Sequence, residues 1–162
     1  MNLQITAYSG LLAMREIAVA EDPRAVHDGL TFAVHPWFSR HADGVDARLV
    51  YRACRQFEFD AGAFSRHVGW LETLARLIGI ESLDLFWRSP QPGPFAELLN
   101  FTDGDATIGP SMCAKLGRDF AQWAHLAARH QNRQFRLKYA LWRHAFETGA
   151  SDGCVAFSAR GA

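Results

Sequence analysis

The chain has 162 residues, of which 49% are hydrophobic and 12% aromatic, and its 17 basic and 17 acidic residues cancel to zero formal charge. This composition is typical of one folded domain with a buried core and excludes a disordered chain. Zero net charge argues against a protein whose main role is to coat nucleic acid, although it leaves room for a local basic patch. We therefore expect a single domain over residues 1–162.

The cysteines and the N-terminal sequence indicate in which cellular compartment the protein is expected. The three cysteines are far apart and form no CxxC pair, which argues against a zinc knuckle and a disulfide framework and favours small buried thiols. The N-terminus has no basic segment followed by a long apolar one, and no apolar run approaches the ~18 residues that span a bilayer. These features predict a soluble, cytoplasmic protein with no membrane partner.

The first third of the chain carries patterns typical of strands. Residues 3–8 alternate apolar and polar side chains, which predicts a strand covered on one face. Residues 30–34 are apolar and β-prone and end at a His-Pro pair, which predicts an edge strand. Residues 49–59 fit a strand or a helix, and we favour a strand. The Trp37-Phe38 pair suits either an exposed contact or a plug over the sheet, and we favour the plug.

Helical patterns dominate the middle and later parts of the chain. Apolar residues recur at helical spacing over residues 64–78, with Gly79 in the place of a C-cap glycine. Residues 80–94 are rich in proline and predict a stiff surface connection. Residues 110–127 and 135–146 carry aromatic stripes at helical spacing, and the short gap between them predicts an antiparallel helix pair.

The chain ends with a strand pattern over residues 153–157, which predicts a strand that pairs back into a sheet. Together the elements predict an α+β fold, a small mixed domain in which an antiparallel sheet from the N- and C-terminal strands packs on three main helices. We expect Trp123 and Trp142 in the helix pair to be largely buried.

Several phrases of the sequence are similar to those of one family. Residues 3–9 read Leu-Gln-Ile-Thr-Ala-Tyr-Ser, residues 59–65 read Phe-Asp-Ala-Gly-Ala-Phe-Ser, and residues 95–110 read Phe-Ala-Glu-Leu-Leu-Asn-Phe-Thr-Asp-Gly-Asp-Ala-Thr-Ile-Gly-Pro. With the closing helix and strand, they resemble, in order and over nearly the whole chain, a family of uncharacterised bacterial and phage proteins. The resemblance implies a phage or mobile-element setting and supplies no activity.

The chain departs from that family's pattern at two places. A Ser-Tyr-Ser-Gly-Tyr phrase of the family is replaced by Ala-Phe-Ser-Arg-His at residues 63–67. A Cys-Glu-Gly phrase is replaced by Gly-Asp-Ala at residues 104–106. Any chemistry that relatives perform with those polar residues is therefore expected to be lost here.

Two carboxylates, Asp103 and Asp105, lie one residue apart before a helix start at Pro110. A calcium site needs about six to eight converging oxygens, and the rest of a D-x-D-x-D-G pattern is missing. Gly104 allows a tight turn, and carboxylates favour the positive end of a helix. We predict an architectural turn and helix cap. The alternative is a small enzyme or metal-binding protein that uses Asp103 and Asp105 with a histidine.

Other catalytic patterns are missing from the sequence. It contains no G-x-S-x-G, Walker loop or G-x-G-x-x-G. His125 and His130 are not spaced to share a helix face, which argues against a zinc site. Cys113 lies on the apolar stripe of its predicted helix, so we expect a core thiol. We predict no metal and no cofactor.

Arginines recur beside the aromatic face of the last predicted helix, and this arginine stripe comprises Arg129, Arg133, Arg136 and Arg143. It is either a solvated helix face or a contact surface for an anionic partner. With no complete catalytic constellation, we predict a non-enzymatic binding protein of phage or mobile-element origin that contacts a host component, such as a defence factor. Its expected partner is a protein with an acidic surface; nucleic acid and a second copy of the chain are alternatives.

Overall fold

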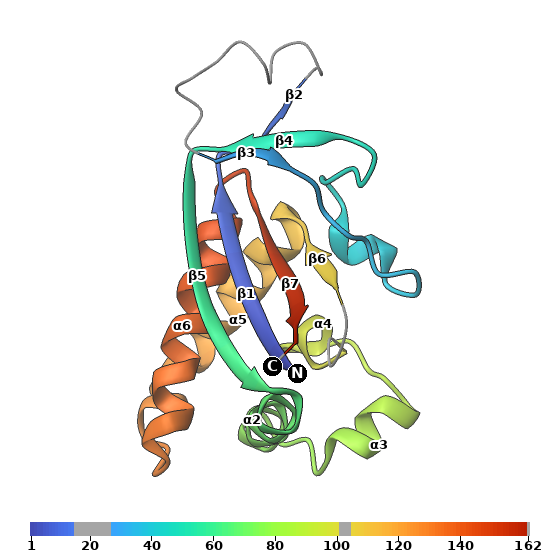
Figure 1. Cartoon of the computed structure of the whole chain (residues 1–162). Helices are drawn as coiled ribbons and strands as arrows, with labels where there is room; N and C mark the ends of the chain where they lie inside the picture. The colour runs from blue at the N-terminus through green and yellow to red at the C-terminus, as the bar shows by residue number, and fades with distance from the viewer. Residues whose placement is uncertain (15–26, 101–104, 162) are drawn as a thin grey trace.

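A four-stranded antiparallel sheet forms the centre of the molecule (Figure 1). The computed structural model describes residues 1–14, 27–100 and 105–161. The strand order is β5-β1-β7-β6, comprising β5 Arg55–Ala63, β1 Asn2–Ser9, β7 Cys154–Arg160 and β6 Ala106–Ile108. The strands from the two ends of the chain are hydrogen-bonded neighbours, with Ile5 opposite Phe157. This arrangement confirms the predicted α+β fold and its sheet of terminal strands.

A smaller sheet lies across one end of the main sheet (Figure 1). Its order is β2-β4-β3, comprising β2 Leu12–Met14, β4 Val50–Ala53 and β3 His27–Leu30. Phe32, Tyr51 and Cys154 form the buried cluster that joins the two sheets. Residues 49–59 are therefore strands, as predicted, and they supply β4 and most of β5.

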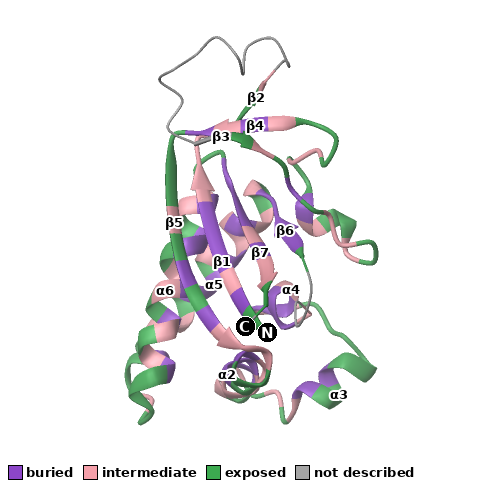
Figure 2. Ribbon diagram, viewed as in Figure 1, coloured by how far each residue is buried: buried purple, intermediate pink, exposed green. Residues whose placement is uncertain are grey.

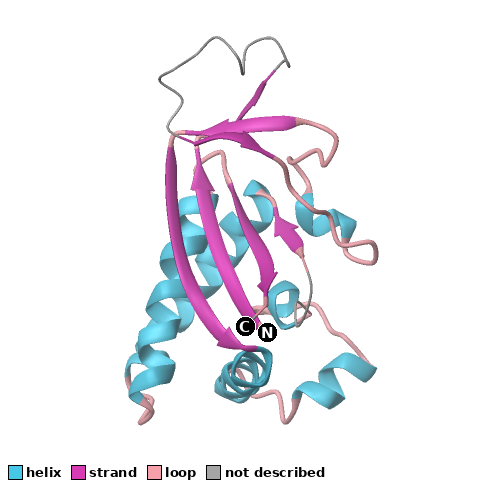
Figure 3. Cartoon of the chain, in the orientation of Figure 1, coloured by secondary structure: helices cyan, strands magenta, loops and turns pink. Residues whose placement is uncertain are grey.

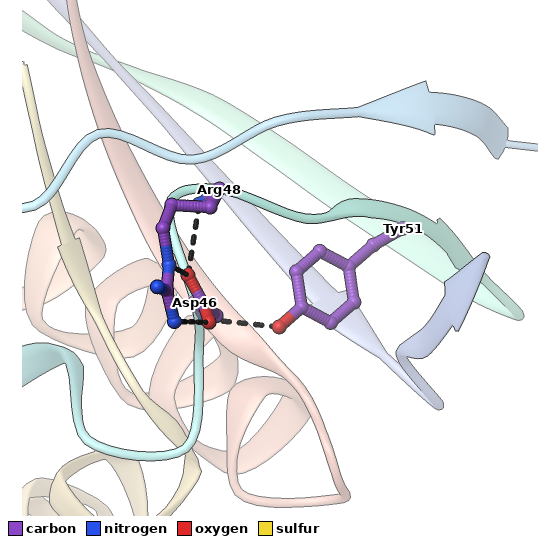
Figure 4. A network of polar contacts seen from close by, with 3 residues as sticks. All are labelled: Asp46, Arg48 and Tyr51. Atoms are coloured by element: carbon purple, nitrogen blue, oxygen red, sulfur yellow. Dashed lines mark hydrogen bonds and ion pairs between the residues drawn. The ribbon is translucent and has the colours of Figure 1, made fainter. Parts of the chain in front are cut away.

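A polar network holds the turn before β4 (Figure 4). The Asp46 carboxylate accepts hydrogen bonds from the backbone N–H and the guanidinium of Arg48, at 2.9 and 2.8 Å. The Asp46 backbone N–H donates to the hydroxyl oxygen of Tyr51 at 2.9 Å. The hydrogen bonds from Arg48 lower the pKa of the Asp46 carboxyl to about 2. The network is solvent-exposed on one side and fixes a turn.

The helices lie mainly on one face and at one end of the main sheet (Figures 1 and 3). The long helices are α2 Phe64–Leu77, α5 Pro110–Ala128 and α6 Arg133–Gly149. Shorter elements are the 3-10 helix η1 Ser39–Ala42 and the helices α3 Leu83–Arg88 and α4 Ala96–Leu99. The three predicted helices are confirmed, and Gly79 follows α2 with a φ of 88°, as a C-cap glycine does.

Helices α5 and α6 form the predicted antiparallel pair. The Asn132 side chain caps α6 by accepting from the backbone N–H groups of Gln134 and Phe135, at 2.9 and 3.2 Å. The Tyr139 hydroxyl of α6 donates to the Phe120 carbonyl of α5 at 2.7 Å. These contacts fix the start of α6 and its register against α5.

The core lies between the sheet and the helices, where Figure 2 shows buried residues along the inner sides of α5, α6 and β1. Trp142 is fully buried at its centre. Its ring lies 5.2 Å from that of Phe59, 5.9 Å from Trp70 and 5.7 Å from Phe146, measured between centroids. The prediction for Trp142 is therefore confirmed, whereas Trp123 is only half-buried.

Three local predictions are wrong. Residues 80–94 are not only a connection, because α3 forms there. Its start is capped by the Ser82 hydroxyl, which accepts from the Leu85 N–H at 3.2 Å, and Phe86 is buried. The strand predicted over 30–34 ends at Leu30. The plug predicted for the Trp37-Phe38 pair fails at Trp37, 84% of which is exposed, whereas Phe38 is half-buried and packs against the core.

Candidate functional site

A cleft separates helix α2 from the N-terminal end of α6. One cavity of about 410 Å³ is lined by Arg66, Gly69, Trp70 and Thr73 of α2 and by Asn132, Gln134, Phe135 and Lys138 at the start of α6. A second cavity of about 420 Å³ is lined by Thr73, Arg76, Leu77 and His130. Because the two cavities share Thr73, they adjoin along α2. We call the pair the basic cleft.

The floor of the basic cleft is rigid and aromatic. The rings of Trp70 and Phe135 stack with centroids 5.6 Å apart. The Trp70 indole N–H donates to the Phe135 carbonyl at 3.3 Å, so its donor is already occupied. Both residues are nearly buried, at 7% and 2% exposure. The floor thus joins α2 to α6 and leaves the rim to interact with a ligand.

The rim of the basic cleft is cationic. Arg66, Arg76 and Lys138 line it, and none of the described residues that line it is acidic. Arg76 donates to the Glu72 carboxylate at 3.3 Å, and its side chain remains 67% exposed. Glu72 also accepts from the Leu83 N–H at 3.0 Å, so both of its carboxylate oxygens are engaged. The lining is therefore complementary to an anion.

Lys138 reaches into the cleft from a partly buried position. Its ammonium group donates to the Ala61 carbonyl at the end of β5. Burial lowers the pKa of Lys138; the Asp60 carboxylate opposes this shift and the Arg66 guanidinium adds to it. A negative charge bound near Lys138 would offset both the burial and the repulsion from Arg66.

The arginine stripe is divided by the fold. Arg129 is the C-cap residue of α5, whereas Arg133 is the first residue of α6. The Arg136 guanidinium donates to the carbonyls of His130 and Gln131, the latter at 3.2 Å, and so holds the turn between α5 and α6.

Arg143 donates to Glu147 at 2.8 Å, with 40% of its side chain exposed. Because an α-helix turns by roughly 100° per residue, Arg136 and Arg143 lie on the flank of α6 opposite Gln134 and Lys138. The stripe therefore does not continue into the basic cleft. Its role in partner binding stays a prediction.

The acidic pair is only partly described. Asp103 lies outside the described residues. The Asp105 carboxylate accepts from the Ala159 backbone N–H at 3.0 Å and ties the start of β6 to the end of β7. The cap of α5 is Gly109, with no side-chain hydrogen bond. Asp105 thus fastens two strands, which differs from the predicted helix cap.

The predicted thiols have different environments. Cys113 is fully buried, as expected of a core thiol; its Sγ donates to the Ile108 carbonyl at 3.3 Å, and burial raises its pKa. Cys154 is likewise buried, and burial raises its pKa as well. Cys54 is exposed at the bend between β4 and β5, so the expectation of buried thiols is wrong there. Within the described part of the chain, no cluster of three or more histidine, cysteine, aspartate or glutamate residues is suited to a metal ion.

A second polar cluster, missed by the sequence reasoning, is structural. The Lys115 ammonium lies 2.7 Å from both Glu97 and Asp119 and 2.6 Å from the Gly93 carbonyl. Asp119 also accepts from the Phe95 N–H at 3.0 Å. Phe95 is fully buried with a φ of 57°, an unusual conformation for a bulky residue. The cluster therefore holds this strained turn against α5.

Comparison with known proteins finds no match: no family model, no curated protein and no solved structure is similar to the chain. The resemblance to the bacterial and phage family therefore stays a prediction. Among the helices of the described residues, none has the length and apolar character needed to cross a membrane.

Proposed function

We propose that the protein is a non-enzymatic binding module that takes an acidic segment of a partner protein into the basic cleft. The observation that carries the proposal is the cleft's lining, which combines Arg66, Arg76 and Lys138 with no acidic residue among its described members. Cationic surfaces of this kind select partners of opposite charge and speed their association.

The dimensions of the cleft suit a short extended peptide. Residues 66–76 of α2 run along both cavities, and ten helical residues rise by about 15 Å. An extended chain covers roughly 3.3 Å per residue, so four or five residues of a partner match this length. The rigid Trp70–Phe135 floor also supports the proposal, because a preformed site loses little entropy on binding.

The setting of this activity is part of the proposal. The resemblance to bacterial and phage proteins supports an origin in a phage or mobile element, with a host protein as the partner. A segment rich in aspartate or glutamate on a host defence factor has the charge that the basic cleft requires. The exposed Arg133, at the start of α6, would contact the same partner outside the cleft.

A peptide titration tests the proposed function. Acetylated pentaglutamate is added to ¹⁵N-labelled protein, and the Trp70 indole resonance reports binding in the cleft. We expect Arg66→Gln to weaken binding roughly tenfold, the equivalent of about 1.4 kcal/mol. Arg118→Gln, which removes an exposed arginine of α5, is the matched control and should bind as the wild type does. No movement of the Trp70 resonance, or equal losses in the two variants, would contradict the proposal.

A further inference from the structure

Two cations converge at one end of the basic cleft. A Cβ atom placed on Gly62 would lie 3.2 Å from the Lys138 ammonium and 3.7 Å from the Arg66 Cβ. Gly62 has a φ of 94°, a conformation that favours glycine. Because glycine has no Cβ, both side chains have room to pass beside it. Repulsion from the Arg66 guanidinium contributes to the lowered pKa of Lys138, and both side chains line one cavity, so the two positive charges interact.

One carboxylate, that of Asp60, compensates part of the charge at this place, and it raises the pKa of Lys138 by more than Arg66 lowers it. Asp60 is the nearest acid that acts on Lys138, and both of its oxygens are engaged: Oδ1 accepts from the Gly62 N–H at 2.6 Å and Oδ2 from the Asn2 amide at 3.2 Å. Asp60 is not among the residues that line the cleft. Asp60 therefore acts from outside the cavity, and none of the ion pairs of the described residues joins it to Lys138 or Arg66.

The neighbouring side chains at this end can donate hydrogen bonds. The side-chain carbonyl oxygen of Asn132 caps α6, and its NH₂ group is available to donate to a ligand. Gln134 lines the same cavity and carries a second NH₂ group. With the guanidinium of Arg66 and the ammonium of Lys138, the cavity offers donors from four side chains. A ligand rich in acceptor oxygens fits this set.

We propose that the Arg66–Lys138 end of the basic cleft is a phosphoryl subsite that holds a phosphorylated serine, threonine or tyrosine of the acidic partner. This inference rests on the proposed function and specifies its ligand. A phosphate monoester carries a charge of about −1.5 to −2 and three acceptor oxygens, which match two cations and two amide donors. A carboxylate carries a single charge and two acceptor oxygens, fewer than this set of donors can engage.

The other end of the cleft differs in a way that indicates which end holds the phosphoryl group. Arg76 is already paired with Glu72, but 67% of its side chain is exposed. The exposed N–H groups of its guanidinium suit a single carboxylate. The phosphorylated residue therefore lies near the start of α2, and the acidic residues that flank it extend toward Arg76 and His130.

Two peptides test the subsite. One is acetylated pentaglutamate, and the other is the same peptide with phosphoserine at its centre. We expect wild-type protein to bind the phosphopeptide at least roughly tenfold more tightly, because the phosphate dianion makes more charge-assisted hydrogen bonds than a carboxylate does. Arg66→Gln and Lys138→Gln should each abolish this ratio. Arg76→Gln, which removes the same charge from the other cavity, should weaken both peptides and keep the ratio.

The pH dependence gives a second readout. The second ionisation of a phosphate monoester has a pKa of about 6, so the preference for the phosphopeptide should increase between about pH 5 and 7.5 as the dianion forms. A preference that does not change over this range would overturn the subsite.

The outcomes separate the two proposals. Equal affinity for the two peptides would overturn the phosphoryl subsite and leave the proposed function standing, whereas no binding of either peptide would overturn both. A third probe, pentathymidylate, tests nucleic acid as the source of phosphate. Tighter binding of this oligonucleotide than of the phosphopeptide would overturn the assignment to a phosphorylated protein.

Discussion

Replacement of Trp142 by alanine should lower the free energy of unfolding by about 3–5 kcal/mol. The side chain is fully buried and packs against the rings of Phe59 and Phe146. An indole of about 200 Å² at ~25 cal/mol per Å² corresponds to about 5 kcal/mol. The loss is reduced because the Trp142 indole N–H has no hydrogen-bond partner among the described residues, so its removal relieves a desolvation cost.

Urea denaturation followed by circular dichroism measures this change. Trp142→Phe is the matched control, since it keeps an aromatic ring and removes the buried N–H; we expect it to cost less than about 1.5 kcal/mol. A midpoint of Trp142→Ala equal to that of the wild type, with the same slope, would refute the packing described for the core. Equal losses in both variants would contradict the reasoning, because Trp142→Phe keeps a buried ring and should leave the smaller cavity.

Further predictions concern the polar contacts and the thiols. Asp119→Asn should cost about 1.5–3 kcal/mol in the same assay, because it weakens two charge-assisted hydrogen bonds; an unchanged midpoint would show that the cluster contributes nothing. Asp105→Ala should cost about 0.5–1.5 kcal/mol, and calcium should not raise the melting temperature of the wild type; a calcium-dependent increase lost in the variant would reverse this assignment. Ellman's reagent should label one thiol rapidly at pH 8, that of Cys54, because Cys113 and Cys154 are buried with raised pKa values. Rapid labelling of Cys54→Ser would contradict the burial of the other two.

Elements with a strong local signal were predictable from the sequence. The apolar stripes of α5 and α6 repeat over several helical turns, so the helix pair was expected. The strands β1 and β7, near the two ends of the chain, are rich in β-prone residues, so the central strands were expected as well. Short elements were not. β6 has three residues and forms because it pairs with β7, and α3 has six residues and depends on burial of Phe86. Tertiary contacts of this kind leave little pattern in a sequence.

The candidate site was missed for a related reason. Arg66 lies on α2 and Lys138 on α6, far apart in the chain, and the packing of α2 on α6, with Trp70 against Phe135 and Trp142, brings them to one cavity. The arginine stripe had a clear sequence signal, but a turn between α5 and α6 divides it, and Arg136 is engaged at the end of α5. A periodic charge pattern identifies a helix face and does not identify which neighbours that face will have.

A charge reversal tests the binding role of the basic cleft most directly. The variant Arg66→Glu with Arg76→Glu should fold normally, because the ion pair to Glu72 that it removes and the repulsion from Glu72 that it introduces are each worth only about 0.3–0.5 kcal/mol. Calorimetric titration at low salt should show that the wild type binds acetylated pentaglutamate and not pentalysine, and that the variant binds pentalysine and not pentaglutamate. A folded variant that still binds pentaglutamate with wild-type affinity would contradict the assignment of the cleft as the binding site.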